Sequence, residues 1–404
     1  MIHASALSIR RAFETMRFAA QLREGWAGYK TTPLLLWIRC FEYPSIAFGG
    51  KLLLIRNSGK MPPPHKGWRQ SFSVLEDMYE RHVKGVPEPP ALSSSAAALL
   101  SAAYVFIYVI PFYLSPATRP SPTLTRDAPS SIRARVRAVT FSTILCSVLT
   151  VVVLNQHETA ASDIVRLLGL WPVSPLDMIR SMLLVIILFA GPIFEHGVVD
   201  GAWRNWIRLA RVHETLSSWI GYRNYIVGPV SEEFVWRSFI IPLHVLARFS
   251  GKQIVFLTPL YFGIAHLHHL YEFRLTHSEV PLFMAVLRSL FQFTYTSLFG
   301  FFAAFVFIRT GNVYTCILAH TFCNWMGLPR FYGRVGVEAG IPIGPPDVDK
   351  KDDEQKSVLA YQGKGIGWTV AYYIILVAGA VGFYYQLFPL TESSHALPVG
   401  LKKA

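Results

Sequence analysis

From about residue 95 to residue 390, the chain alternates between long apolar segments and short connections rich in charge, glycine or proline. A helix that crosses a membrane needs about 20 apolar residues, and eight segments approach or exceed that length. They cover residues 96–114, 139–154, 178–199, 225–246, 253–270, 281–308, 313–328 and 367–388. The pattern therefore predicts an all-α, polytopic membrane bundle of about eight transmembrane helices.

The beginning and the end of the chain follow a different pattern. Residues 1–94 are basic, and their apolar runs are too short to cross a bilayer. We expect residues 1–94 to form a partly disordered or membrane-surface extension, residues 95–390 to form the transmembrane domain, and residues 391–404 to form a C-terminal tail.

Composition agrees with a membrane protein. Hydrophobic residues make up 52% of the chain and charged residues only 16%, which is too apolar for an ordinary soluble protein. The net charge of +13 is scattered over connections, without a basic run interleaved with aromatic residues. This distribution favours contact with the lipid bilayer and argues against a nucleic-acid partner.

The charges of the connections predict an orientation. The first connection carries five arginines and one acidic residue, and the third carries four arginines and two acidic residues, whereas the second is acidic. Cytoplasmic connections are enriched in Lys and Arg, so the first and third are expected on the cytosolic side. Eight spans then place both ends of the bundle on the opposite side.

The fourth segment contains an unusual group of charges within G-P-V-S-E-E-F-V-W-R-S-F-I-I-P-L, residues 228–243. A carboxylate at membrane depth costs roughly 2.5–3.5 kcal/mol, so Glu232, Glu233 and Arg237 need partners or a function. Glu233 and Arg237 are four residues apart on a helix and can pair. Glu232 points about 100° away and is free to face the interior of the bundle.

Two later segments carry polar groups at helical spacing. Phe262 and His266 share a helix face in the fifth segment, and His320 and Asn324 share one in the seventh. With the predicted orientation, all of these groups and Glu232 fall in the cytosol-facing half of the membrane. We interpret them as one intramembrane active site, rather than as separate structural hydrogen-bonding groups.

A carboxylate, two imidazoles and an amide suit hydrolysis of a peptide bond by water. Glu232 can take a proton from water that His266 helps to orient. His320 and Asn324 can donate hydrogen bonds to the developing oxyanion, while Arg237 neutralises Glu233. The site needs no metal or other cofactor in this interpretation.

Other interpretations remain open at this point. Glu232, His266 and His320 could instead hold a catalytic zinc ion, although no H-E-x-x-H motif is present. His268, His269 and Glu272 could be further ligands, or solvated polar groups at a helix end. A transporter or a scaffold would also bury ion pairs, but the first half of the chain contains no repeat of the fourth segment.

The three segments together resemble the type II CAAX prenyl endopeptidases, the Ras-converting enzymes of the wider CPBP (Abi) membrane-protease family. The motifs E-E-x-x-x-R, F-x-x-x-H and H-x-x-x-N occur at 232–237, 262–266 and 320–324, and R-D-A-P begins at Arg126. The likeness covers about residues 96–390.

The resemblance implies an enzyme of the endoplasmic reticulum membrane whose active site faces the cytosol. It implies substrates that are prenylated CAAX proteins, such as Ras- and Rho-like small GTPases, from which the enzyme removes the C-terminal aaX tripeptide. It also implies that Glu232 acts as the general base without a metal.

Overall fold

The computed structural model describes residues 90–121, 124–157, 159–208, 210–336, 364–399 and 401. The predicted N-terminal extension, residues 1–94, lies almost entirely outside these ranges. Within them, all regular secondary structure is helical, which confirms the prediction of an all-α membrane bundle.

The helices of the first half are α4 Ser94–Val109, α5 Pro111–Leu114, α6 Pro129–Gln156, α7 Ala161–Leu167, α8 Pro175–Leu188, α9 Ala190–Ile193, the π-helical turn η2 Phe194–Val199, α10 Trp203–Arg208, α11 Ala210–Ser217 and α12 Trp219–Tyr222. Those of the second half are the π-helical turn η3 Arg223–Val227, α13 Gly228–Glu233, the π-helical turn η4 Phe234–Phe239, α14 Ile240–Leu246, α15 Gly251–Ala265, α16 His268–Thr276, α17 Leu282–Thr310, α18 Val313–Met326, α19 Ile366–Gln386 and the 3₁₀ turn η7 Pro389–Thr391.

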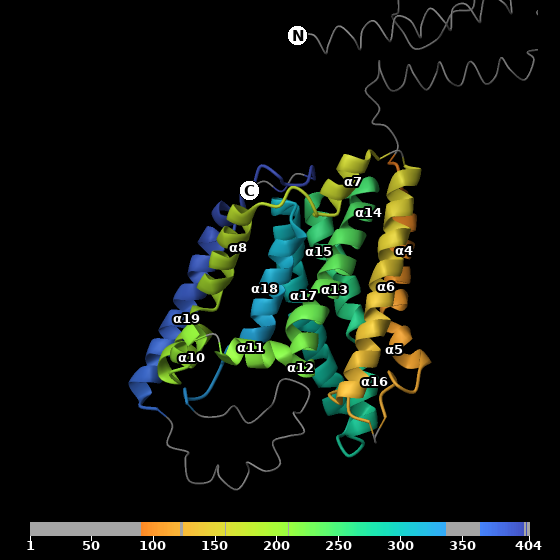
Figure 1. Cartoon of the computed structure of the whole chain (residues 1–404). Helices are drawn as coiled ribbons and strands as arrows, with labels where there is room; N and C mark the ends of the chain where they lie inside the picture. Colours follow the sequence, from red (N-terminus) through yellow and green to blue (C-terminus); the bar gives the residue numbers. More distant parts are fainter. Residues whose placement is uncertain are drawn as a thin grey trace, which may run out of the picture. The chain divides into compact units, whose positions relative to one another are not determined.

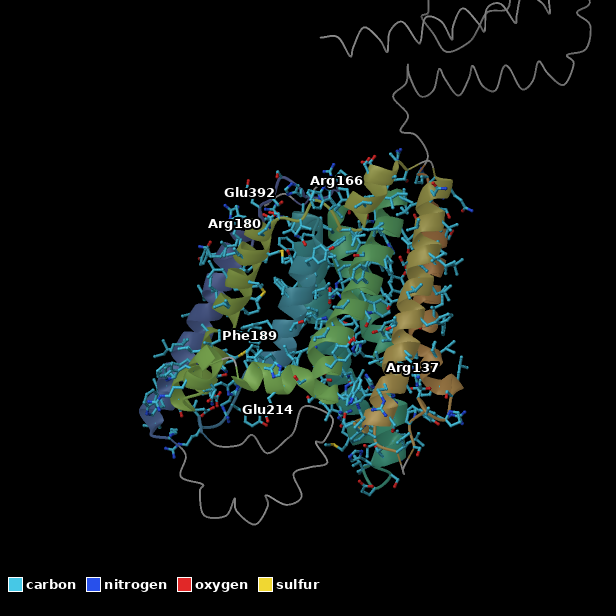
Figure 2. The ribbon with its side chains drawn as sticks, in the orientation of Figure 1. Arg137, Arg166, Arg180, Phe189, Glu214 and Glu392 are labelled. Atoms are coloured by element: carbon cyan, nitrogen blue, oxygen red, sulfur yellow. The ribbon has the colours of Figure 1, made fainter. Side chains whose placement is uncertain are left out.

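The long helices of this bundle stand side by side (Figure 1). Helices α4 and α6 form one edge, α8 and α19 form the other, and α13, α14, α15, α17 and α18 lie between them. Charged residues mark both ends: Figure 2 labels Arg166, Arg180 and Glu392 at one end, and Arg137 and Glu214 at the other. Large apolar side chains, such as Phe141 on α6, are exposed on the outer faces, as expected of surfaces that contact lipid.

Four helical segments of the described chain are long and apolar enough to cross a membrane: Ser94–Leu114, α6, α17 and α19. A fifth is formed by Pro175–Leu188 and Ala190–Val199 if this pair, bent by 76°, counts as one span. The other three predicted segments are also helical, so the structure is compatible with eight spans, and that number remains a prediction.

Two predicted segments differ from the helices observed. Helix α6 begins at Pro129, ten residues before the apolar segment that starts at residue 139. The first three turns of the helix carry arginines, so they do not appear in the apolar pattern. The segment 178–199 is not one straight helix: it bends sharply at Phe189, two residues before Gly191 and three before Pro192. Proline removes a helical hydrogen bond.

The first and the last described residues of the bundle lie on the same side of it, opposite the basic connections. The Leu92 amide donates to the carbonyl oxygen of Leu246 at the end of α14, and the Gly251 amide donates to the Val399 carbonyl oxygen. The amide of Leu397, which is buried, donates to the Ile308 carbonyl oxygen at 2.8 Å, so the C-terminal segment packs against the bundle. This agrees with the predicted placement of both bundle ends on one side.

Candidate active site

The fourth predicted segment is a continuous but irregular helix. It passes from the π-helical turn η3 into α13, which contains both glutamates, and then into the π-helical turn η4, which contains Arg237. A π-helical turn closes hydrogen bonds between residues five apart and often occurs at functional sites. The pair Glu232–Glu233 therefore lies between two such turns, in the half of the bundle nearer α11 and α12 (Figure 1).

Glu233 and Arg237 form a buried ion pair, as predicted. Arg237 Nε lies 3.1 Å from Glu233 Oε2, and Arg237 Nη1 donates to Glu233 Oε1 at 3.1 Å. The side chains are 0% and 2% exposed, so both charges have lost their water. The guanidinium also lies 5.0 Å above the ring of Phe262 and 5.5 Å above that of Phe299, which adds cation–π attraction.

His320 joins α18 to both glutamates. Its Nδ1 donates to Glu233 Oε1 at 2.7 Å, and its Nε2 lies 3.8 Å from Glu232 Oε2. The bond to Glu233 fixes the orientation of the ring, in the way that a carboxylate orients a catalytic histidine. Glu232 is the more accessible acid, with 20% of its side chain exposed against 0% for Glu233.

His266 approaches the same place from the end of α15. Its ring lies 4.6 Å from the Phe262 ring, edge to face, and its Nδ1 donates to the Phe262 carbonyl oxygen at 2.8 Å. Phe262 also lies 6.3 Å from the His320 ring, so one aromatic side chain contacts both imidazoles and Arg237. With Nδ1 bonded to the backbone, the Nε2 of His266 is available for a water or a substrate.

Small residues bring α15 close to α17, and this contact positions His266. A Cβ atom on Gly300 of α17 would lie 2.6 Å from the Pro259 Cβ atom, and one on Gly263 of α15 would lie 2.8 Å from the ring of Phe293. Close approach of helices at small residues is the usual way to pack them within a membrane. A side chain at either glycine would push α15, and with it the imidazole, away from α17.

Asn324 occupies the exposed end of the site. It lies one turn beyond His320 on α18, and its side-chain amide donates to the carbonyl oxygen of Asn224 at 2.9 Å. The structure thus brings Glu232, Glu233, Arg237, Phe262, His266 and His320 together. It places Asn324 against η3, without a hydrogen bond to these groups among the described residues.

The part of the chain that carries these residues matches a known protein family. The family model for Type II CAAX prenyl endopeptidase Rce1-like proteins matches residues 214–326, a range that contains all seven predicted site residues. A probable CAAX prenyl protease 2 of Schizosaccharomyces pombe is 34% identical over 238 residues, covering 59% of this chain and 83% of that protein. CAAX prenyl protease 2 of Arabidopsis thaliana is 29% identical over 323 residues, covering 75% and 91%.

The chain belongs to the Rce1-like CAAX prenyl endopeptidase family. CAAX prenyl protease 2 of Homo sapiens is 36% identical over 175 residues, covering 41% of this chain and 50% of that protein. No solved structure matches with comparable significance. Membership makes the chain a protease, and its apolar helices make it a multi-pass membrane protein.

The Rce1-like chain has a second polar cluster just beyond His266. Glu272 Oε1 accepts from Arg135 Nη2 at 2.6 Å, and Glu272 Oε2 accepts from His269 Nδ1 at 2.7 Å. Burial raises the pKa of Glu272, but the hydrogen bond from His269 and the neighbouring arginine charges hold that pKa below its usual range. His268, His269 and Glu272 lie close enough to hold a metal, yet the arginines supply the positive charge instead.

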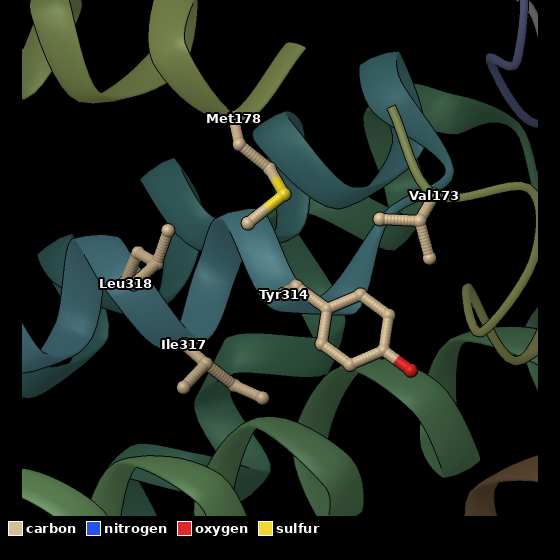
Figure 3. A pocket seen from close by; sticks show the side chains of 5 residues that line it. All are labelled: Val173, Met178, Tyr314, Ile317 and Leu318. Carbon is tan, nitrogen blue, oxygen red and sulfur yellow. The ribbon is translucent and has the colours of Figure 1, made fainter. Parts of the chain in front are cut away.

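An apolar groove lies between α8 and α18, away from the glutamates. Figure 3 shows Val173, Met178, Tyr314, Ile317 and Leu318 around it. The groove continues along α8 with a volume of about 630 Å³, lined there by apolar side chains. It offers contact surface to an apolar chain but no group for hydrolysis.

Two contacts of the Rce1-like site were not predicted from the sequence. Phe299 lies 4.7 Å from the His320 ring and lies under Arg237, but in the sequence it is one of several phenylalanines in an apolar run. Asn224 lies in the third connection, and the charges of that connection predict only the orientation of the bundle in the membrane. No spacing rule links either residue to a histidine on another helix.

Proposed function

We propose that this enzyme removes the C-terminal aaX tripeptide from prenylated CAAX proteins by means of a water molecule that Glu232 activates. The observation that carries the proposal is the position of His320 between two carboxylates of different exposure, 2.7 Å from Glu233 and 3.8 Å from Glu232. The buried acid fixes the imidazole, and the more accessible acid is left to exchange protons.

The reaction follows from these positions. Glu232 takes a proton from water while oxygen attacks the carbonyl carbon of the prenylated cysteine. With His320 protonated on both ring nitrogens, its Nε2–H and one N–H of the Asn324 amide donate to the oxyanion, and that amide has a second N–H to bond to Asn224. Glu232 then returns the proton to the leaving nitrogen, which yields a new cysteine carboxylate and a free tripeptide. His266 orients the water through its Nε2.

The membrane setting suits such a substrate. A prenyl chain enters lipid with a gain of about 0.8 kcal/mol per buried CH₂, which holds the scissile bond at the depth of the site. We propose the endoplasmic reticulum membrane as the location, with the basic end of the bundle and the site facing the cytosol. The substrates would be prenylated small GTPases of the Ras and Rho type.

The alternative mechanism uses a zinc ion, and the ligand atoms of a zinc ion must all lie close to one point. Zinc–nitrogen distances of about 2.0–2.1 Å require ligand atoms closer than about 4 Å to one another. Among the described residues, the triad Glu232, His266 and His320 is not a group whose ligand atoms all lie within 4.8 Å of one another. This geometry favours the carboxylate mechanism.

The proposal is tested with purified full-length protein and a farnesylated peptide that ends in a CAAX sequence. We expect release of the intact tripeptide, at least ten times slower release from the unprenylated peptide, and the same rate after a metal chelator is added. Loss of activity with the chelator and its return with zinc would contradict the mechanism. Failure to release any tripeptide would contradict the function.

A further inference from the structure

Three arginines from separate parts of the basic end lie next to the active site. Arg126 precedes α6, Arg135 lies within α6, and Arg223 begins η3. They surround two acidic residues, Asp127 and Glu272. The cluster therefore holds an excess of positive charge beside the opening of the site, where Asn324 is exposed.

Two of these arginines are already paired. Arg135 binds Glu272 at 2.6 Å and the Thr118 carbonyl oxygen at 3.0 Å. Arg223 binds Asp127 at 2.7 Å, and its Nε donates to the Asn224 side chain at 2.8 Å. These arginines hold α6, α16 and η3 together, and each has a carboxylate of its own.

Arg126 is the cation with unused donors. Its nearest carboxylate oxygen, in Glu272, is 4.0 Å away and already accepts from His269. Its Nε is shielded from solvent and has no hydrogen-bond acceptor among the described residues, although a third of the side chain is exposed. Burial and the repulsion from Arg223 lower the pKa of Arg126, so an added anion would relieve an unfavourable charge.

Short contacts link Arg126 to His266 through His269 and Glu272. The His266 and His269 rings are 5.8 Å apart, His269 bonds to Glu272 at 2.7 Å, and Glu272 lies 4.0 Å from Arg126. Three extended residues span about 10 Å. Tyr295 on α17 interacts electrostatically with both Arg126 and Glu232, so both charges lie near the same part of α17.

We propose that Arg126 binds the C-terminal carboxylate of the substrate and thereby sets the cleavage point three residues from the end of the chain. The inference rests on the proposed function. The guanidinium matches a carboxylate with two parallel hydrogen bonds, and this match makes arginine the usual residue for recognising such a group. Arg126 is thus a specificity-determining residue that acts at a distance from the reacting bond.

The test compares two farnesylated peptides that differ only in ending as a free acid or as a carboxamide. For the wild-type enzyme we expect kcat/KM to be about 10- to 100-fold higher for the acid, as is typical of a lost charge-assisted hydrogen bond. Arg126→Gln should lower kcat/KM for the acid by a similar factor and change the carboxamide less than threefold. Arg126→Lys should recover part of the preference, and Arg137→Gln, an exposed arginine on α6, should keep all of it.

Each other outcome has a distinct meaning. Equal wild-type cleavage of the acid and the carboxamide would overturn the inference and leave the proposed function intact. An Arg126→Gln enzyme that keeps the preference, or that loses the same factor on both peptides, would also overturn it. Cleavage of neither peptide by the wild-type enzyme would overturn the proposed function itself.

Discussion

Replacing Glu232 with glutamine is expected to lower the rate of tripeptide release by about 10²–10⁴-fold, the usual contribution of a general base. Glutamine has nearly the same shape but cannot accept a proton from water. Because the Glu232 side chain is partly exposed and its nearest partner, His320 Nε2, is 3.8 Å away, the substitution should leave the fold intact.

The measurement is single-turnover release of the tripeptide from a farnesylated CAAX peptide, followed by mass spectrometry. Glu392→Gln is a matched control, since Glu392 is an exposed acid at the other end of the bundle (Figure 2). The control should release tripeptide at the wild-type rate. A Glu232→Gln enzyme within threefold of wild type would remove Glu232 from the mechanism.

Replacing Glu233 with glutamine is expected to affect stability and activity together. The substitution leaves the Arg237 guanidinium, 2% exposed, without a counter-charge. Breaking a buried ion pair in this way costs about 3–5 kcal/mol. It also weakens the bond that orients His320, so we expect both a lower apparent Tm in detergent and a rate of tripeptide release at least ten times lower.

A double variant separates the two effects of Glu233. In Glu233→Gln with Arg237→Met, the uncompensated charge is gone, and an apolar side chain can replace the guanidinium above Phe262 and Phe299. We expect most of the apparent Tm to return, while the release rate stays low because His320 still lacks its carboxylate. Full recovery of the rate would contradict a role for Glu233 in orienting the imidazole.

Contacts within one helix were predictable from spacing alone. The i, i+4 rule anticipated the pair of Glu233 with Arg237 and the packing of Phe262 on His266, and both occur in the structure. The Glu233–Arg237 pair forms even though Arg237 lies in a π-helical turn. The arginine side chain is long and flexible enough to reach the carboxylate despite the changed helical spacing. The all-α fold was equally predictable, since runs of apolar residues leave few alternatives.

The individual partners of side chains on different helices were not predictable. The bond from His320 to Glu233 depends on how α18 packs on α13, and the sequence assigned that carboxylate to Arg237 alone. The same holds for the bond from the Asn324 amide to the carbonyl oxygen of Asn224 on η3, which no spacing rule predicts. The start of α6 was missed because Arg133, Arg135 and Arg137 lower its apolar content without ending the helix.

The central claim is that groups from α13 and α15 act on one water molecule, and a double-mutant cycle on kcat/KM tests it most directly. The cycle compares Glu232→Gln, His266→Gln and the double variant in tripeptide release from the farnesylated peptide. Groups that act as a unit show strongly non-additive losses. The account predicts that the double variant is no more than about threefold slower than the slower single variant. Losses that multiply would show that the two side chains act independently and would contradict a shared site.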